Sequence, residues 1–305
     1  MPQPTAEVTI SVSELEEMIN RQFPSLAPSR AVLLGTGWDN WAYCVNDRYV
    51  FRFPRRQIAV PLIEREVRLM AFIAARVRLA VPVPLYVGRA DSLYPWPFAG
   101  HELIPGRTAC VADLNESQRS QIAPVLAEFL RSLHSIPAEL ALAQGAVGDE
   151  IGRLDLSRRI TQARYRLDML IERGLLADAK PLLRILNLSA MTRYPPRMDT
   201  LVHGDLYARH LIVDPADNLT GIIDWGDLHV GDAAVDLAIA YTFLPSTGRA
   251  EFCLAYGEIQ PDVWTMARFR ALYHTLALRL YAEDLRDVAL IAESSRALRY
   301  LGSDL

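Results

Sequence analysis

Apolar and polar residues alternate over short runs in the N-terminal third of the chain, which is the pattern of half-buried β-strands. Two longer segments instead repeat apolar side chains at helical spacing. In the first of them, Ser13 as N-cap and Glu16 three residues later predict a capping box. The pattern therefore predicts strands at residues 31–35, 41–46, 49–54, 83–88 and 98–104, and helices at 13–22 and 61–77.

The second helix carries a carboxylate inside its apolar stripe. Glu66 lies within the stripe, whereas Glu64, Arg65 and Arg68 fall on other faces. An unpaired charge is expensive to bury, so Glu66 needs a partner, and Arg52 on the strand before the helix is the nearest candidate. The alternative is an ordinary surface arginine and a glutamate at the edge of the stripe. The stripe consists of Leu62, Ile63, Leu69, Met70 and Ile73.

After about residue 105, helical spacing dominates, interrupted by a hairpin in which LIVD and TGII flank the turn PADN at residues 211–223. We therefore expect an α+β protein with a small sheet-rich part, residues 1–105, joined near IPGRT to a larger helical part, residues 106–305. The predicted helices of the second part include residues 117–136, 157–176, 178–191 and 233–244.

Composition and charge exclude several classes of partner. A formal net charge of -4 argues against a nucleic-acid-binding face. The widely spaced Cys44, Cys110 and Cys253 indicate neither a disulfide framework nor a zinc site. The N-terminus lacks the pattern of a secretion signal, and no apolar run approaches the roughly 18 residues of a membrane span. We expect a soluble, cytoplasmic protein without membrane attachment, and nothing indicates an obligate protein partner.

The hairpin places two aspartates at its ends. Asp205 stands before the first strand and Asp224 after the second. A hairpin brings its ends together, so the two carboxylates are expected to approach each other. Such a pair is repulsive unless a cation or a substrate lies between its members.

A turn between the first two predicted strands contains Gly35 and Gly37. Glycines let backbone N–H groups face a phosphate, and Asn40 tolerates the unusual dihedral angles that a glycine would otherwise supply. An ordinary hairpin with two glycines is the competing interpretation.

Taken in order, the glycine turn, Arg52, Glu66, a hinge-like strand, HGDLYARHLIVD and GIIDWGD resemble the aminoglycoside phosphotransferases and the related macrolide kinases, over about residues 31 to 290. The resemblance implies a bilobal protein-kinase-like fold and transfer of the γ-phosphoryl group of ATP or GTP, with Mg²⁺, to a hydroxyl. By this resemblance, Asp205 is the catalytic aspartate and Asp224 the metal-binding one. Arg52 and Glu66 would steady the phosphates beneath the 35–40 turn.

Two positions depart from the general kinase pattern. His210 stands five residues after Asp205, where kinases usually have asparagine, and Mg²⁺ prefers oxygen ligands. The aminoglycoside 2''-phosphotransferases and macrolide kinases also carry histidine there, so we expect His210 and Asp224 to position the metal together. Arg52 replaces the usual lysine and is longer and planar. His203 is expected to be a buried structural histidine that bonds the backbone.

The stretch FAGHELIPG resembles the hinge of the same family. Backbone groups near Glu102 and Ile104 would bond the purine, and Phe98 would stand at the back of its pocket. Backbone recognition leaves ATP and GTP undistinguished.

A protein kinase would need a long activation segment after the metal-binding aspartate. Here only LHV separates IDWGD from the next buried helix, so the acceptor is expected to be a small molecule. A polycationic aminoglycoside would need carboxylates, and a macrolide would need an apolar pocket. The resemblance of IDWGD to the same element of the aminoglycoside 2''-phosphotransferases favours an aminoglycoside. A metabolic kinase of choline, fructosamine or homoserine type and a catalytically silent nucleotide-binding module remain alternatives. The available carboxylates are Asp227, Glu283, Asp284 and Asp287, and the available aromatic residues are Phe243, Trp264, Tyr273 and Tyr281.

Overall fold

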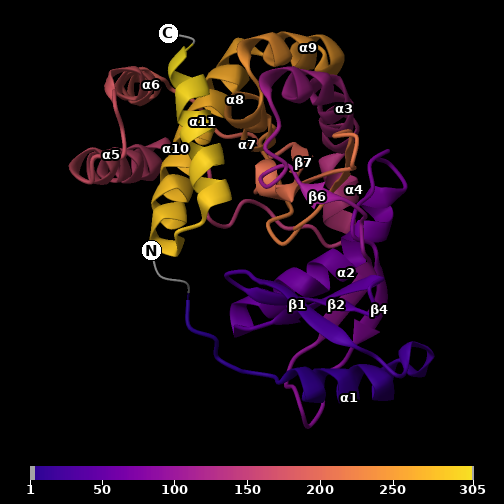
Figure 1. Ribbon diagram of the computed structural model, residues 1–305. Coiled ribbons are helices and arrows are strands. Elements are labelled where there is room, and N and C mark those ends of the chain that lie inside the picture. The colour runs from indigo at the N-terminus through magenta and orange to yellow at the C-terminus, as the bar shows by residue number, and fades with distance from the viewer. Residues whose placement is uncertain (1–3, 304–305) are drawn as a thin grey trace.

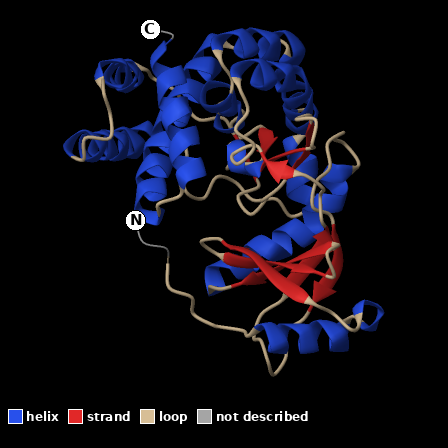
Figure 2. Ribbon diagram, viewed as in Figure 1, coloured by secondary structure: helices blue, strands red, loops and turns tan. Residues whose placement is uncertain are grey.

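The computed structural model describes residues 4–303, and its smaller lobe is built on an antiparallel sheet in the order β1-β2-β3-β5-β4. All five strands predicted for this part are present. Figure 2 shows the large sheet in this lobe, whereas helices make up most of the other, as the bilobal α+β prediction requires. The strands are β1 (Ala31–Thr36), β2 (Asn40–Val45), β3 (Tyr49–Pro54), β4 (Pro84–Gly88) and β5 (Phe98–Glu102).

Two helices cover opposite faces of this sheet (Figure 1). Helix α1 (Val12–Gln22) lies on the outer face, where its Leu15 and Met18 share a core with the aromatic side chains of the strands. Helix α2 (Val60–Ala74) lies between the sheet and the larger lobe. Its Leu69, Met70 and Ile73 are buried in the core of the larger lobe, so α2 connects the two lobes by apolar packing.

The capping box of α1 lies two residues before the predicted one. Ser11 is the N-cap and accepts from the Glu14 N–H at 3.3 Å, while the Glu14 carboxylate accepts from the Ser11 N–H at 2.8 Å. The prediction of Ser13 and Glu16 is wrong because Glu16 accepts instead from the Ala31 N–H of β1, at 2.7 Å. A tertiary contact thus takes the carboxylate that the local pattern assigned to the cap.

Arg65 of α2 is a second correction. It was expected on a face away from the buried stripe, but it is only 8% exposed. Its guanidinium lies 3.5 Å from the Leu228 carbonyl oxygen and 4.0 Å from the Glu150 carboxylate, both in the larger lobe. The buried surface of α2 is therefore wider than its apolar stripe, because the larger lobe covers a second face of the helix.

The larger lobe is organised around α10, which packs against α5, α6, α7, α8 and α11. The predicted helix at 233–244 is divided at Ala238 into α7 and α8. No helix within residues 4–303 is long and apolar enough to cross a membrane. The remaining helices are α3 (Glu116–His134), α4 (Ala138–Ala143), α5 (Leu156–Glu172), α6 (Lys180–Met191), α7 (Ala234–Leu237), α8 (Ile239–Phe243), α9 (Ser246–Tyr256), α10 (Pro261–Leu285) and α11 (Val288–Ser303), with short 3₁₀ helices at Pro24–Leu26, Gln57–Ala59 and Ala208–His210.

Small sheets fill the side of the larger lobe that meets the smaller one. The predicted hairpin is present and joins β6 in the order β6-β8-β9. Ala80, in the segment after α2, donates to the Thr220 carbonyl at 3.0 Å and accepts from the Ile222 N–H at 2.9 Å, so the hairpin is bonded to the smaller lobe. The strands of this region are β6 (Arg107–Thr108), β7 (Thr200–Val202), β8 (Leu211–Val213), β9 (Leu219–Ile222) and β10 (His229–Gly231).

Candidate active site

The HGD segment forms a tight turn whose backbone N–H groups are bonded by a buried carboxylate. Gly204 has φ +89°, and a Cβ at this position would lie 2.2 Å from the Asp227 carbonyl oxygen. The fully buried Asp236 of α7 accepts from the N–H groups of His203 and Gly204 at 2.7 and 2.9 Å. The turn is therefore fixed by backbone geometry on one side and by a charge-assisted hydrogen bond pair on the other.

His203 has the structural role that the sequence predicts. Its fully buried ring donates through Nε2 to the Ile223 carbonyl at 3.0 Å and accepts through Nδ1 from the Asp205 N–H at 3.3 Å. Burial lowers the pKa of this ring, which keeps it neutral in this bonding pattern. His203 thus connects the two ends of the hairpin beside Asp205 and Asp224.

His210 lies between the two aspartates. Its Nδ1 donates to the Asp205 carbonyl oxygen at 2.7 Å and lies 4.0 Å from the Asp205 carboxylate. Its Nε2 is 3.3 Å from the Asp224 carboxylate. The expected approach of the two aspartates is therefore present, with an imidazole between them.

The bonding of His210 fits a shared cation. Because Nδ1 carries the proton given to the carbonyl, Nε2 can bond Asp224 only when the ring is doubly protonated. Burial lowers the pKa of the ring, but the hydrogen bond to Asp224 and the charges of Asp224 and Asp205 outweigh it and raise the pKa. A divalent cation would replace that proton, with an imidazole nitrogen and a half-exposed carboxylate as its protein ligands.

Asp224 and His210 do not form a complete metal cage. Within residues 4–303, no group of three or more His, Cys, Asp or Glu side chains is arranged to hold a metal ion. Mg²⁺ in nucleotide sites characteristically takes one or two protein carboxylates and completes its shell with phosphate and water oxygens. The residues present fit a magnesium–nucleotide site of that kind. They do not fit a structural metal site in which the protein supplies every ligand.

The predicted Arg52–Glu66 pair is present and extends to Asp224. The Arg52 guanidinium donates to both Glu66 oxygens at 2.8 and 2.6 Å and to Asp224 at 2.9 Å. Burial would raise the pKa of Asp224, but the charge of Arg52 and the hydrogen bond from His210 lower it well below its usual value. One guanidinium thus joins β3, α2 and the end of the hairpin.

Three basic residues that the sequence reading missed surround the HGD turn. His274 Nε2 lies 3.0 Å from the Asp205 carboxylate. Arg153 and Arg270 donate to the Gly204 carbonyl at 3.2 and 3.4 Å. His274 and Arg270 stand four residues apart and so share a face of α10, but nothing in the sequence around them marks the face that meets the HGD turn.

The glycine turn corrects the expected role of its residues. Gly35, Gly37 and Asn40 all have negative φ, so the prediction that Asn40 tolerates unusual dihedral angles is wrong. Gly37 instead donates to the Asn40 carbonyl at 2.8 Å. The buried side-chain oxygen of Asn40 has no hydrogen-bond partner among the described residues. At the tip of the turn, the Trp38 ring lies 5.7 Å from the Tyr281 ring of α10.

The strand register also corrects the expected position of Phe98. Arg52 is paired with Ala99, so Ala99 shares the face of Arg52 and Phe98 points to the opposite one. There the Phe98 ring is fully buried and stacks on Phe53 at 4.4 Å. At the other hinge positions, the Glu102 side chain bonds Arg48 at 3.0 Å, and Ile104 packs close to Gly221 of β9.

Comparison with known proteins identifies the family. The model of the phosphotransferase enzyme family, APH, matches residues 30–272. The chain belongs to this family. An aminoglycoside 3'-phosphotransferase from Streptomyces fradiae is 32% identical over 187 residues, which cover 59% of this chain and 65% of that protein, slightly less than two thirds of its length.

Solved structures show that this phosphotransferase has the expected bilobal kinase-like fold. The GDP complex of wild-type aminoglycoside 2'-phosphotransferase-IIIa has a TM-score of 0.70 at 24% identity and covers 97% of this chain and 100% of that one. Macrolide 2'-phosphotransferase type I has a TM-score of 0.61 at 22% identity and covers 96% and 99%. The predicted family, fold and enzyme class are thereby confirmed.

The side chains expected to bind an acceptor in this phosphotransferase are largely engaged elsewhere. Phe243 is fully buried, Tyr273 and Tyr281 are nearly so, and Trp264 packs on Tyr241. These rings do not form an open apolar pocket. The four candidate carboxylates all pair with arginines: Asp227 with Arg153, Glu283 with Arg279, Asp284 with Arg173 and Asp287 with Arg209. Of these, the Asp227 side chain remains half exposed.

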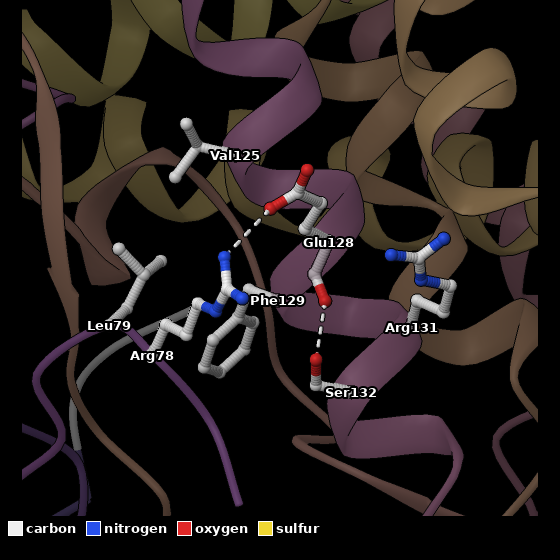
Figure 3. Close-up of a pocket in the computed structure, with 7 residues that line it drawn as sticks. All are labelled: Arg78, Leu79, Val125, Glu128, Phe129, Arg131 and Ser132. Carbon is white, nitrogen blue, oxygen red and sulfur yellow. Dashed lines mark hydrogen bonds and ion pairs between the residues drawn. The ribbon is translucent and has the colours of Figure 1, made fainter.

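A separate pocket of about 230 Å³ lies between α3 and the segment after α2 (Figure 3). Arg78 reaches across it to Glu128 at 3.9 Å, and Ser132 bonds the Glu128 carbonyl at 2.8 Å. None of its lining residues belongs to the constellation around Asp205 and Asp224.

Proposed function

We propose that this phosphotransferase transfers the γ-phosphoryl group of ATP or GTP to a hydroxyl of a small molecule, with Asp205 as the catalytic residue. The observation that carries the proposal is the arrangement of Asp205 and Asp224 on either side of His210, with Arg52 joined to Asp224 and Glu66. Phosphoryl transfer needs two things of a protein: an oriented hydroxyl and fixed charges around the phosphates.

In this mechanism the acceptor hydroxyl donates a hydrogen bond to the Asp205 carboxylate. Its oxygen forms the new bond to the γ-phosphorus while the bond from that phosphorus to the bridging oxygen breaks, and Asp205 takes the hydroxyl proton late. Burial would raise the pKa of Asp205, but the hydrogen bond from His274 and the charges of His210 and Arg270 hold it well below its usual value. The carboxylate is therefore ionised and ready to accept.

The donor nucleotide would lie between the glycine turn and the HGD hairpin. The turn that contains Gly35 and Gly37 would cover its phosphates, with the Gly37 N–H engaged by the Asn40 carbonyl, and the backbone near Glu102 and Ile104 would face the purine. Mg²⁺, when bound by Asp224 and His210, would neutralise phosphate charge. Arg52 can bond phosphate oxygens through the same fork that now bonds Glu66 and Asp224.

An aminoglycoside is the acceptor class we propose first. The family membership and the 32% identity to an aminoglycoside 3'-phosphotransferase support it. The half-exposed Asp227 supports it as well, because Arg153 donates both to its carboxylate and to the Gly204 carbonyl, which places that carboxylate beside the turn that carries Asp205. An ammonium group beside Asp227 would place a neighbouring hydroxyl near Asp205. A macrolide is the second candidate, on the likeness of fold to the macrolide kinase.

The test is phosphate transfer from labelled ATP and GTP to a panel of aminoglycosides and macrolides, extended to choline, fructosamine and homoserine. Transfer to a panel member by the wild type, and about a thousandfold lower kcat in Asp205→Ala with unchanged nucleotide affinity, is the expected result. Near-native turnover in Asp205→Ala would overturn the assignment of Asp205. Nucleotide binding without transfer to any acceptor would favour the catalytically silent module.

A further inference from the structure

Helix α10 contributes a histidine to the catalytic loop from far along the chain. His274 Nε2 lies 3.0 Å from Oδ1 of Asp205, which is hydrogen-bond distance, and the Tyr207 ring packs nearly perpendicular to the imidazole with 5.5 Å between the ring centroids. The family match ends at residue 272, so the contact comes from a part of the chain beyond the matched segment.

The two oxygens of Asp205 are not equivalent. Oδ1 lies 3.0 Å from His274 Nε2, whereas Nδ1 of His210 lies 4.0 Å from Oδ2, which is too far for a hydrogen bond, and already donates to the Asp205 backbone carbonyl. Oδ2 is therefore the oxygen left for an acceptor hydroxyl. Rotation of the carboxylate about its χ2 bond would exchange the two oxygens, and the bond to His274 opposes that rotation.

The hydrogen bond has a defined donor. Burial and the charge of Arg270, one turn earlier on α10, lower the pKa of His274, so the ring is neutral and carries its proton on Nε2. A neutral donor orients the carboxylate without neutralising it. Arg153 and Arg270 bond the Gly204 carbonyl instead, so they fix the turn and leave the carboxylate to His274.

We propose that His274 is a positioning residue that holds Asp205 Oδ1 through Nε2–H and thereby aims Oδ2 at the acceptor hydroxyl. The inference deepens the proposed phosphotransfer and rests on it. Misplacing a reacting group by about 1 Å can cost roughly 100-fold in rate, so removing this hydrogen bond should lower kcat.

The kinetic test compares His274→Leu with His274→Gln in the full-length protein. Leucine fills the space without a donor, whereas the glutamine Nε2 reaches the same point as the imidazole Nε2. We expect about a 10- to 100-fold lower kcat in H274L with KM values within about twofold, and recovery of most of that kcat in H274Q. Thr265→Val, which removes a polar group from the exposed first turn of α10, is the matched control.

Two results would overturn the proposal: H274L with wild-type kcat, or H274Q as slow as a correctly folded H274L, because then the ring would only fill space. A second measurement needs no acceptor. Two-bond ¹H–¹⁵N correlation spectra, with His274 assigned by its absence in H274Q, should show the neutral Nε2–H form and a changed shift in Asp205→Ala. A proton on Nδ1 instead would contradict the bond. If the wild type transfers phosphate to no acceptor, the proposed function fails while these spectra still decide the contact.

Discussion

Arg52 is the residue at which charges from both lobes meet. Its guanidinium satisfies Glu66 with two hydrogen bonds and Asp224 with a third, so a planar fork is used in two directions at once. A lysine ammonium is a point charge that cannot reproduce this fork, although kinases usually carry lysine at the matching position. In this chain the basic residue at that position is an arginine, which reaches two carboxylates at the same time.

Arg52→Lys should therefore weaken nucleotide binding more than the chemical step. We expect a KM for the nucleotide raised about tenfold, because one ammonium cannot hold Glu66, Asp224 and a phosphate together. Steady-state kinetics with varied ATP or GTP measures this change. Arg197→Lys, at a half-exposed pair with Asp262, is the matched control. An unchanged KM in R52K would show that Glu66 alone sets the position of this charge.

At the scale of elements, the HGD turn depends on a glycine for two separable reasons. Gly204 has φ +89°, which strains any side chain, and its missing Cβ leaves room for the Asp227 carbonyl. Gly174 also has positive φ, +67°, but a Cβ there would meet nothing within 4 Å. Gly204 and Gly174 therefore share a left-handed backbone, but only Gly204 lies against a neighbouring atom that would clash with a Cβ.

Gly204→Ala should destabilise the protein by about 1–3 kcal/mol more than Gly174→Ala, and it should also lower kcat because the carbonyl of Asp227 must move. Urea unfolding gives the two free energies of unfolding, and phosphate transfer gives the rates. Equal destabilisation by the two substitutions would mean that φ strain alone matters at the turn.

Elements with a local signal were predictable from the sequence. The hairpin around PADN, the stripe of α2 with Glu66 inside it, and the buried His203 follow from periodicity and from the cost of burying a charge. The face to which Phe98 points was not predictable, because it depends on the register with the partner strand, in which Arg52 is paired with Ala99. Glu16 was misassigned because β1 takes its carboxylate.

The residues of α10 that reach the catalytic loop had no such local signal. His274 and Arg270 lie about seventy positions after Asp205, and nothing in their neighbourhood states which helix face will meet the HGD turn. Their role follows from the packing of α10 in the larger lobe. The boundary between residues 105 and 106 and the catalytic roles of the site residues stay predictions.

At the scale of the whole molecule, each lobe contains a buried histidine that resists protonation. Burial lowers the pKa of His101 in the smaller lobe and of His229 in the larger lobe to about 4. In the unfolded chain these rings have a pKa near 6.5. Between these values the unfolded state binds more protons, so the free energy of unfolding falls as the pH falls.

Each ring should cost about 2 kcal/mol of stability between pH 7 and pH 5. Urea unfolding at the two pH values measures the total over all titrating groups, so a variant that removes one ring is needed to isolate its share. His229→Asn keeps a donor for the Asp227 carbonyl and removes the titrating ring, so its loss of stability on acidification should be smaller than that of the wild type by that amount. An identical pH dependence in H229N would contradict the assignment.

The contact between Trp38 and Tyr281 joins the tip of the glycine turn to the helix that carries His274. The proposed phosphate site lies beneath this turn, so any movement of the turn away from the larger lobe must separate the two rings. Where release of the product nucleotide requires that movement, the rate at which the rings separate would limit turnover, however fast the chemical step becomes.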